Sequence, residues 1–476
     1  MVSTGGLEKF LRRRKPSFSG EFILIEDTFG RYLVAVIGAG PAGLFASRLL
    51  AMNNVHVVLL NRDLIPGGLA EYGIYFNKYK MKEGLRKQFQ QILELSNIDY
   101  YGNIKVGEQG DFRLPDLRAM GFQALLVTAG AQGTKWLGLP GENLVGVYHA
   151  KDIVFHYNLL PPFGTQNFQI GKRVALIGAG NVMLDMAHWL IRELKVDEVI
   201  SVVRRGPNEV KFSKEELKIV VHNLDLAKLF AEVERVRPVA DAVGQNVDEA
   251  KDYILSALPK GLEPVSKTRF YFDFLASPSR ILGNEQGIVK GLEIEDTTLV
   301  CSEGEVQAKK LGTRHVLDVD TVIFCIGDKV DETFGLPVRM NAFIKNPNPL
   351  HPVEGLSFEA YDPDLNRPID RVFVAGWSRE ASSGLVGVAR KDGENGARAV
   401  LDYLQTASRL VDPKSILDEF ESKLEKLNKP IIGKPDLQKL VEAELKEAEK
   451  LGLPAFKFAT NDEMVAVMGL KNPIAG

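Results

Sequence analysis

Two short apolar runs near the start of the chain flank a segment with helical spacing. The runs at 32–37 (YLVAVI) and 55–60 (VHVVLL) have the length and composition of strands that are buried on both faces. Between them, the apolar residues of 44–52 recur at the spacing of a helix that follows a glycine-rich turn. The pattern predicts a strand, a turn, a helix and a second strand of a parallel sheet.

The turn of this unit has the spacing G-x-G-x-x-G, with Gly38, Gly40 and Gly43 at its fixed positions. The first glycine allows a tight turn, the second lets backbone N–H groups approach a pyrophosphate, and the third lets the helix pack closely on the strand. The helix N-terminus adds the positive end of a dipole. Because two predicted strands frame the motif, it indicates a dinucleotide site rather than a glycine turn without function.

The same pattern recurs at 172–205, where a strand, a turn with Gly178 and Gly180, a helix and a second strand follow one another. Two such units in one chain predict two bound nucleotides, which is typical of proteins that pass electrons between two cofactors. The segments at 121–152 and 320–331 each contain a strand that ends in a glycine-containing turn. We expect the chain to leave and re-enter the first domain there.

These patterns predict an α/β fold with two Rossmann-like domains, the second inserted into a discontinuous first domain. A strand, a Gly-Trp turn, a glycine loop and a helix at 370–404 would complete the first domain. Amphipathic helices at 416–430 and 436–452 form a C-terminal extension, packed either on the host domain or at a subunit contact. The expected segments are the first part of the first domain at 1–150, the second domain at 151–324, the second part of the first domain at 325–405 and the helical extension at 406–476.

Composition excludes several classes of protein. With 476 residues, 45% of them hydrophobic and 25% charged, the chain can bury a large core, and its net charge of -3 creates no general attraction for nucleic acid or a membrane surface. The longest apolar stretch, 32–47, is interrupted by glycines and a proline and is too short to cross a bilayer. Two cysteines and scattered histidines predict neither a C-x-x-C redox pair nor a protein-bound metal. We expect a cytoplasmic protein.

Two adjacent arginines, Arg204 and Arg205, end the second strand of the second unit. In a Rossmann unit the ribose of the dinucleotide lies at this position, where an acid selects the 2′-hydroxyl of NAD and an arginine accommodates the 2′-phosphate of NADP. The planar guanidinium binds a phosphate through two N–H···O bonds. The pair therefore predicts NADP(H). The alternative is a surface pair that binds Asp or Glu.

Several longer motifs together resemble the adrenodoxin-reductase type of ferredoxin–NADP reductase, an FAD flavoprotein family related to the small subunit of glutamate synthase. They are VIGAGPAG (36–43), YGNIKVG (101–107), LPGENLVGVYHAKDIVFHYN (139–158), LIGAGNVMLDMA (176–187), VVRRGP (202–207) and AGWSREASSGLVG (375–387). The Gly-Trp pair at 376–377 favours the reductase branch, because the glutamate synthase subunit usually carries Gly-Asp there. The resemblance implies an enzyme that moves hydride between NADP(H) and FAD, and single electrons between FAD and ferredoxin or a similar acidic carrier.

The resemblance also implies which residues contact each cofactor. For FAD they are Gly38, Gly40, Ala42, Gly43, Asn61, Leu69, Val106, Gly130, Trp377, Gly384, Leu385 and Val386. For NADP(H) they are Gly178, Gly180, Asn181, Val182, Met183, Arg204, Arg205, Glu216 and, at the nicotinamide, Gly384. The candidate catalytic residues are Asp185 and Lys78.

Three positions depart from the family pattern. Asn61 stands where the family has an acid that binds the FAD ribose, so either FAD binds more weakly or Asp63 takes over. Met183 replaces a small residue and would push helix and strand slightly apart. Lys78 replaces a histidine, and because a lysine of ordinary pKa is a poor proton shuttle near neutral pH, it would act as an electrostatic contact.

The expected docking surface departs from the family as well. The helical stretch 224–261, which is basic in adrenodoxin reductase, has more acids than bases here. A basic run at 78–87 is an alternative site for an acidic carrier, and a solvated helix face is the competing interpretation. Two other functions stay open: an electron-input flavoprotein subunit of a larger iron–sulfur complex, with the C-terminal helices as its interface, and a nucleotide-binding protein without turnover.

Overall fold

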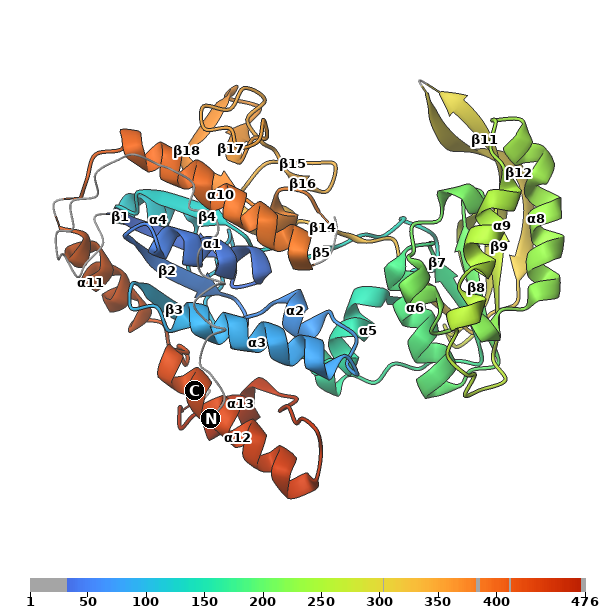
Figure 1. Ribbon diagram of the computed structural model, residues 1–476, viewed down its shortest axis with the longest axis horizontal. Coiled ribbons are helices and arrows are strands. Elements are labelled where there is room, and N and C mark those ends of the chain that lie inside the picture. Colours follow the sequence, from blue (N-terminus) through green and yellow to red (C-terminus); the bar gives the residue numbers. More distant parts are fainter. Residues whose placement is uncertain (1–31, 303, 382–385, 411, 472–476) are drawn as a thin grey trace, which may run out of the picture.

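The computed structural model of the protein describes residues 32–302, 304–381, 386–410 and 412–471. They form two lobes, each built around a parallel sheet, that lie side by side and are joined by extended segments (Figure 1). Two expected FAD contacts, Gly384 and Leu385, lie outside the described residues. Within the described ranges, no helix is both long and apolar enough to cross a membrane.

The first lobe contains a six-stranded sheet in the order β17-β18-β4-β1-β2-β3. β17 runs antiparallel to β18, and the other neighbours are parallel. The strands are β1 (Tyr32–Ile37), β2 (Val55–Asn61), β3 (Ile98–Gly102), β4 (Ala124–Val127), β17 (Glu359–Asp362) and β18 (Arg367–Val374). This sheet combines strands from both ends of the described chain, so the first lobe is discontinuous in sequence.

Side chains of β1 alternate between two buried layers. Val34 and Val36 belong to one core with helices α1, α3 and α10, whereas Leu33 and Ala35 belong to a second core with α4 and α11. Cover on both faces explains why the whole strand is apolar. The helices are α1 (Pro41–Ala51), α3 (Tyr79–Leu93), α4 (Leu114–Met120), α10 (Val386–Thr406) and α11 (Pro413–Leu424).

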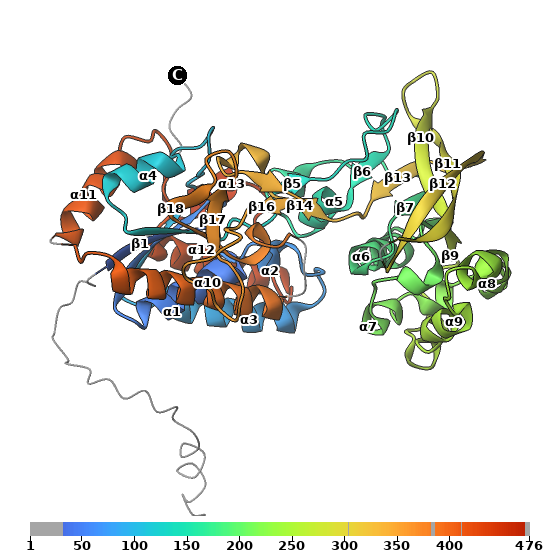
Figure 2. The same ribbon diagram turned by 90° about the horizontal axis from the view of Figure 1, so that it is seen from above.

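The second lobe contains a five-stranded parallel sheet in the order β6-β13-β7-β8-β9. Helices pack on one face, and a three-stranded antiparallel sheet, β10-β11-β12, packs on the other (Figure 2). The strands are β6 (Val147–His149), β7 (Arg173–Ile177), β8 (Glu198–Val203), β9 (Arg269–Phe274), β10 (Ala276–Gly283), β11 (Val289–Ser302), β12 (Glu305–Leu317) and β13 (Thr321–Phe324). The helices are α5 (Ala150–Tyr157), α6 (Asn181–His188), α7 (Lys214–Leu217), α8 (Leu226–Asp241) and α9 (Val247–Leu255).

The expected α/β fold with two Rossmann-like units and a helical C-terminal region is confirmed. The exact segment boundaries stay a prediction, and β6 of the second sheet ends at His149, just before the boundary expected at 151. The outgoing and returning chains meet in a short antiparallel ribbon of β5 (Gly133–Thr134) and β14 (Asp328–Lys329). This ribbon forms part of the connection between the lobes (Figure 2).

Both lobes carry a glycine turn at the carboxyl end of their central strand. Gly38 has a φ of +109°, and a Cβ there would lie 2.6 Å from the carbonyl oxygen of Thr128. Gly178 has a φ of +130°, and a Cβ there would lie 2.7 Å from the carbonyl oxygen of Cys325. Only glycine tolerates this combination of backbone angle and close approach. The two units therefore resemble each other in packing as well as in sequence.

The C-terminal extension packs into the first lobe. Phe420 of α11 is fully buried, with its ring centroid 5.3 Å from that of Phe112 and 5.8 Å from that of Phe122. Beyond α11, Ile432 forms an isolated bridge with Gly102 at the end of β3. Helices α12 (Lys434–Leu451) and α13 (Asn461–Val467) follow and lie beneath α3 in Figure 1. At least this part of the extension belongs to the core of the first lobe.

Phe420→Ala should lower the free energy of unfolding by about 3–5 kcal/mol, because it removes a buried ring and leaves a cavity. Phe230→Ala is the matched control, since that ring is 45% exposed on α8, and its effect should be about 1 kcal/mol or less. Denaturant unfolding followed by circular dichroism measures both variants. If Phe420→Ala lowers the free energy of unfolding no more than the control does, the contact of Phe420 does not stabilise the first lobe.

Candidate active site

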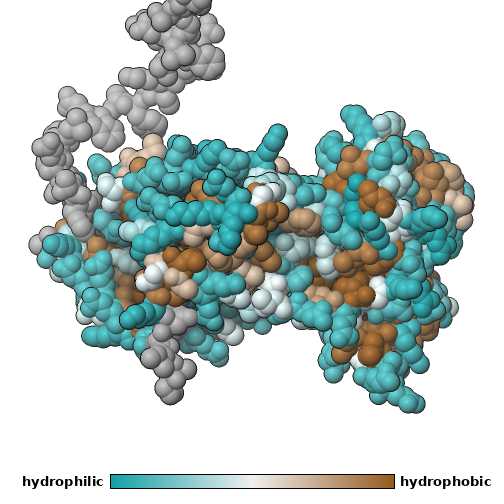
Figure 3. Space-filling model, turned by 90° about the horizontal axis from the view of Figure 1, so that it is seen from below, coloured by the Kyte–Doolittle hydropathy of each residue, from teal (hydrophilic) through white to brown (hydrophobic). Residues whose placement is uncertain are grey.

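A cavity of about 1480 Å³ lies between the two lobes and reaches the carboxyl ends of both parallel sheets. Gly38 and Gly40 of the first turn, Gly178 and Gly180 of the second turn, and Trp377 all line it. The face seen from below narrows to a waist between the lobes, with apolar patches mostly on the second lobe (Figure 3). Ligands of open α/β sheets bind at this edge. The fold therefore brings both glycine turns to one cavity.

Both turns are open where a pyrophosphate would approach. A Cβ built on Gly40 or Gly180 would meet no atom within 4 Å. Each of these glycines is the N-cap of the helix that follows, and no side chain closes either cap. Free N–H groups at a helix N-terminus bind phosphate. The backbone at both turns thus fits the two dinucleotides expected from the sequence.

Most of the expected FAD contacts line the cavity. They are Gly38, Gly40, Ala42, Asn61, Leu69, Val106, Gly130, Trp377 and Val386. Gly43 lies behind the turn, where a Cβ would come within 1.9 Å of the carbonyl oxygen of Gly38. Its position matches the role of the third glycine, which is to let helix α1 approach the strand.

Asn61, the amide at the position of the family's acid, is bound to the backbone around it. Its Oδ1 accepts from the N–H of Ala39 at 3.0 Å, and its Nδ2 donates to the carbonyl oxygens of Asp63 and Ile65 at 2.9 and 3.0 Å. The side chain of Asp63 also belongs to the cavity wall and contacts Arg62 at 3.0 Å. Asn61 therefore shapes the end of the cavity, and Asp63 is the acid beside it.

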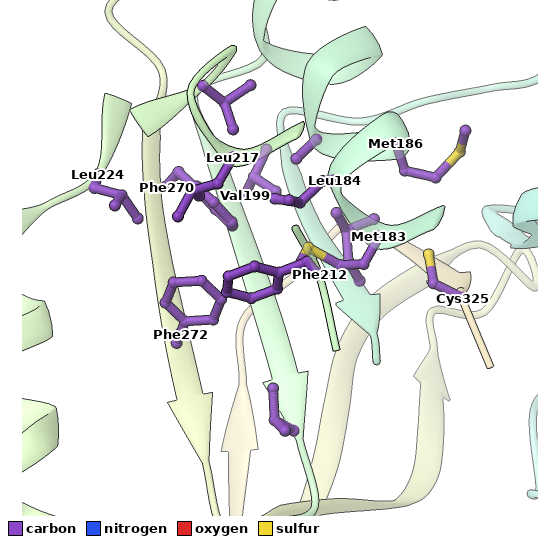
Figure 4. Packing of buried hydrophobic residues seen from close by; sticks show 14 of the residues in the cluster. Met183, Leu184, Met186, Val199, Phe212, Leu217, Leu224, Phe270, Phe272 and Cys325 are labelled. Atoms are coloured by element: carbon purple, nitrogen blue, oxygen red, sulfur yellow. The ribbon is translucent and has the colours of Figure 1, made fainter. Parts of the chain in front are cut away.

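The expected NADP(H) contacts divide into two groups. Gly178, Gly180, Asn181, Val182, Arg204 and Arg205 line the cavity. The side chain of Met183 does not line it, because it is fully buried and points toward Phe212 in the core of the second lobe (Figure 4). A large residue at this position is thus accommodated by the core behind the turn.

The arginine pair is held by its backbone and free at its charged ends. Thr297 donates to the carbonyl oxygen of Arg204 at 2.7 Å, and Leu275 donates to that of Arg205 at 3.1 Å. Among the residues that the structure describes, neither guanidinium has a hydrogen bond or ion pair with the protein. The alternative interpretation, a surface pair that binds Asp or Glu, is therefore not supported by any acid among the described residues.

A further cation of this part of the cavity, Lys211, was not predicted from the sequence. Lys211 lines the same cavity, and its N–H donates to the carbonyl oxygen of Ala179 at 2.8 Å. This bond folds the segment after β8 over the second glycine turn. The only sequence signal is a lysine shortly after the arginine pair, which is too common to single out.

Lys78 and Glu216 pair with each other across the boundary between the lobes. The Nζ of Lys78 donates to the two carboxylate oxygens of Glu216 at 2.8 and 3.1 Å. Neither residue lines the cavity, so a contact of Glu216 with the adenosine end stays a prediction. Asp185 does line the cavity. Burial and the negative charge of Glu216 raise the pKa of Asp185 to about 7, against the opposing effect of Lys78.

The basic run at 78–87 is largely used inside the protein. Lys82 is buried and donates to Oδ1 of Asn158. Arg86 donates to both oxygens of the buried Glu71 at 2.8 and 2.5 Å. Lys87 pairs with an acid on the preceding turn of α3. Lys80 is exposed. Docking of an acidic carrier at this run stays a prediction, and the internal contacts of Lys82 and Arg86 leave fewer of its charges available for it.

A cluster of titratable side chains where the two lobes meet was also not predicted from the sequence. Lys151 donates to the carbonyl oxygen of Gln132 at 2.8 Å and lies 3.6 Å from Asp328 of β14. Beside it, burial and the charge of Lys151 lower the pKa of His149 to about 4, so this imidazole is neutral. These three side chains line the cavity. The topology alone brings them together.

Fold and cavity together define an oxidoreductase with two dinucleotide sites. The family model described as "Pyridine nucleotide-disulphide oxidoreductase" matches residues 32–225. The disulphide chemistry in that name does not fit this chain, whose free cysteines are the exposed Cys301 and the buried Cys325.

Individual relatives narrow the class. NADPH-ferredoxin reductase FprA of Mycobacterium leprae is 29% identical over 410 residues, covering 79% of this chain and 84% of that protein. The mitochondrial NADPH:adrenodoxin oxidoreductase of Homo sapiens is 24% identical and covers 95% of each chain. The structure of Mycobacterium tuberculosis FprA in complex with NADPH superposes with a TM-score of 0.75 at 25% identity, covering 92% of this chain and 99% of that one. The chain is a homologue of the reductases of the adrenodoxin-reductase type, as the motifs indicated.

Asp185→Asn tests the perturbed carboxyl. Because the folded state raises the pKa of Asp185 from 3.8 to about 7, the charged form destabilises the fold, and this loss develops between those pH values and is complete above the higher one. Asparagine does not titrate, so the free energy of unfolding of the variant relative to the native protein should rise between about pH 4 and pH 8.

Glu216→Gln is the companion variant, since it removes the second cause of the shift and should move this window to lower pH. Chemical denaturation at a series of pH values measures the differences. A difference between Asp185→Asn and the native protein that does not change with pH would show that the carboxyl titrates normally.

Proposed function

We propose that the protein is an FAD-dependent oxidoreductase that transfers hydride between NADP(H) and FAD and single electrons between FAD and a ferredoxin-like carrier. The observation that carries this proposal is a single cavity that both glycine turns reach and that Arg204 and Arg205 also line, with no ion pair to either arginine from the described residues. The named relatives are NADPH-ferredoxin and NADPH:adrenodoxin reductases, which supports the same activity.

The residues of the chain supply orientation. FAD, when bound, would supply the uptake of hydride and the release of single electrons. The first turn, through Gly38 and Gly40, would hold the FAD pyrophosphate, and the second turn, through Gly178 and Gly180, that of NADP(H). Holding both dinucleotides in one cavity would align the two atoms between which hydride moves. Alignment of this kind can supply a large part of the reduction in the activation free energy.

Two acids of the cavity have separate proposed roles. Asp63 would bind the FAD ribose, because Asn61 already uses its oxygen on the N–H of Ala39. Asp185 would hold or release a proton at its carboxyl, since a pKa of about 7 suits proton transfer near neutral pH. Lys78 contributes through its charge, which opposes the rise in the pKa of Asp185.

The partner that we propose is ferredoxin or a similar acidic one-electron carrier, in the cytoplasm. Two free cysteines suit a reducing compartment. Self-association through the C-terminal helices is a separate proposal. It is supported by the exposed apolar side chains of α12, among them Val441, Leu445 and Leu451, which are 52%, 65% and 53% exposed.

An anaerobic titration of the purified protein tests the proposed reaction. The protein should show a flavin absorbance band that NADPH bleaches at far lower concentration than NADH. Equal bleaching by both would keep the oxidoreductase and reject the selection for the 2′-phosphate. A protein that binds no flavin, even after incubation with FAD, would overturn the function.

The double variant Arg204→Gln/Arg205→Gln should need about 10²-fold more NADPH to bleach the flavin, because it removes charge-assisted bonds to the 2′-phosphate. The concentration of NADH should change little, since NADH carries no phosphate there. Arg280→Gln, an exposed arginine of β10 outside the cavity lining, is the matched control. Equal losses with NADPH and NADH would show that the pair supports the fold rather than the 2′-phosphate.

A further inference from the structure

Helix α2 (Leu69–Tyr72) forms part of the cavity wall beside the first glycine turn. Leu69 and Ala70 line the cavity. The N–H of Gly67, just before the helix, donates to the carbonyl oxygen of Ala39 at 2.7 Å, and a Cβ on Gly68 would lie 3.2 Å from the Cα of Gly40. A helix of a single turn is not stable on its own. Contacts from outside must therefore fix α2 against the turn.

Glu71 anchors α2 in a buried cluster of charges outside the cavity lining. Glu71 is 4% exposed, and its carboxylate accepts from Arg86 of α3 and from Lys457, which lies between α12 and α13. Burial favours the neutral carboxyl, but bonds and charges from these two cations hold the pKa of Glu71 at about 2. Glu71 is therefore a charged group that depends on both partners.

The contacts of Lys457 converge on α2. Besides the carboxylate of Glu71, its Nζ reaches the carbonyl oxygen of Glu71 at 3.4 Å and lies 4.6 Å from the centroid of the Tyr72 ring. The side chain of Lys457 is 14% exposed, and burial lowers its pKa. A lysine in this setting binds the helix through a carboxylate, a carbonyl and an aromatic face, each of which favours a cation.

The C-terminal end of α2 is held by the residue that follows α5 of the second lobe. Asn158, directly after α5, donates to the carbonyl oxygen of Tyr72 at 3.0 Å. Three separate elements thus grip the helix: α3 through Arg86, the end of α5 through Asn158, and the C-terminal extension through Lys457. Of these, only the extension lies outside both dinucleotide-binding units.

We infer that Lys457 is a positioning residue for the flavin. It fixes α2 against the first glycine turn through Glu71, so the C-terminal extension sets one wall of the FAD site. This inference rests on the proposed function, because it assigns FAD to that turn.

The test compares Lys457→Met with Lys450→Met in the full chain. Lys450 is the matched control, because its side chain is 70% exposed on α12 and pairs with nearby Glu447 at 3.2 Å. FAD is removed and added back, and the dissociation constant, the absorbance spectrum of the bound flavin and the melting temperature are measured. Lys457→Met should weaken FAD binding by about tenfold or more and shift the flavin band, whereas Lys450→Met should change neither.

The variant Glu71→Gln separates positioning from general stability and remains informative where Lys457→Met fails to fold. It should weaken FAD binding and shift the band in the same way. Adding Lys457→Met to Glu71→Gln should then have less effect than in the native background, because both act through one contact. Additive effects, or a lowered melting temperature with an unchanged spectrum and FAD affinity, would overturn the inference.

The same measurements distinguish this inference from the proposed function. A native protein that binds no FAD would overturn the proposed function itself. A native protein that binds FAD, with a Lys457→Met variant that binds it equally and has the same spectrum, would overturn the role of Lys457 alone.

Discussion

The close contact between each glycine turn and the strand beside it is the constraint on which the rest of the structure depends. In the first lobe the turn at Gly38 presses on the residue that follows β4, and in the second lobe the turn at Gly178 presses on the residue that follows β13. These are also the two strands from which the chain crosses between the lobes, by way of the β5–β14 ribbon. One contact in each lobe therefore shapes a phosphate site and sets the start of a crossing, so both sites open into one cavity.

Local chemistry could be predicted from the sequence, and partners distant in the sequence could not. The glycine turns and the pair Arg204–Arg205 are each defined within a few residues, and the structure places them at the cavity. The contacts that escaped prediction join distant positions, as Lys78 does with Glu216 across 138 residues. The basic run at 78–87 shows the same limit: a row of cations was evident, but not that Lys82 is buried.

In the sequence, the departures from the family pattern were the support for a protein without turnover. The structure weakens that support. The core around Phe212 accommodates Met183, and Asn61 is satisfied by the backbone while Asp63 remains in the cavity wall. The positions that supported a nucleotide-binding protein without turnover thus have ordinary structural explanations. A partner that binds at the C-terminal helices would contact only part of their surface, because Phe420 and Lys457 already contact the first lobe.

The ion pairs of Glu71 and of Glu216, which lie outside the cavity lining, differ in burial, and this difference decides how much each one contributes to the position of the elements it joins. Glu71 is nearly inaccessible, and removing one partner of a buried charge is strongly destabilising, so α2 has one well-defined position. Lys78 and Glu216 are 29% and 24% exposed, and pairs of that kind contribute little to stability, about 1 kcal/mol or less. The wall beside the first turn is therefore held firmly. The joint between the lobes depends on apolar packing more than on the pair of Lys78 and Glu216, because Tyr75 is 1% exposed and stacks on His188 of α6 with ring centroids 3.9 Å apart. Hydride transfer between two dinucleotides depends on their alignment, and buried contacts fix both the wall beside the first turn and the joint between the lobes, so the fold itself supplies that alignment.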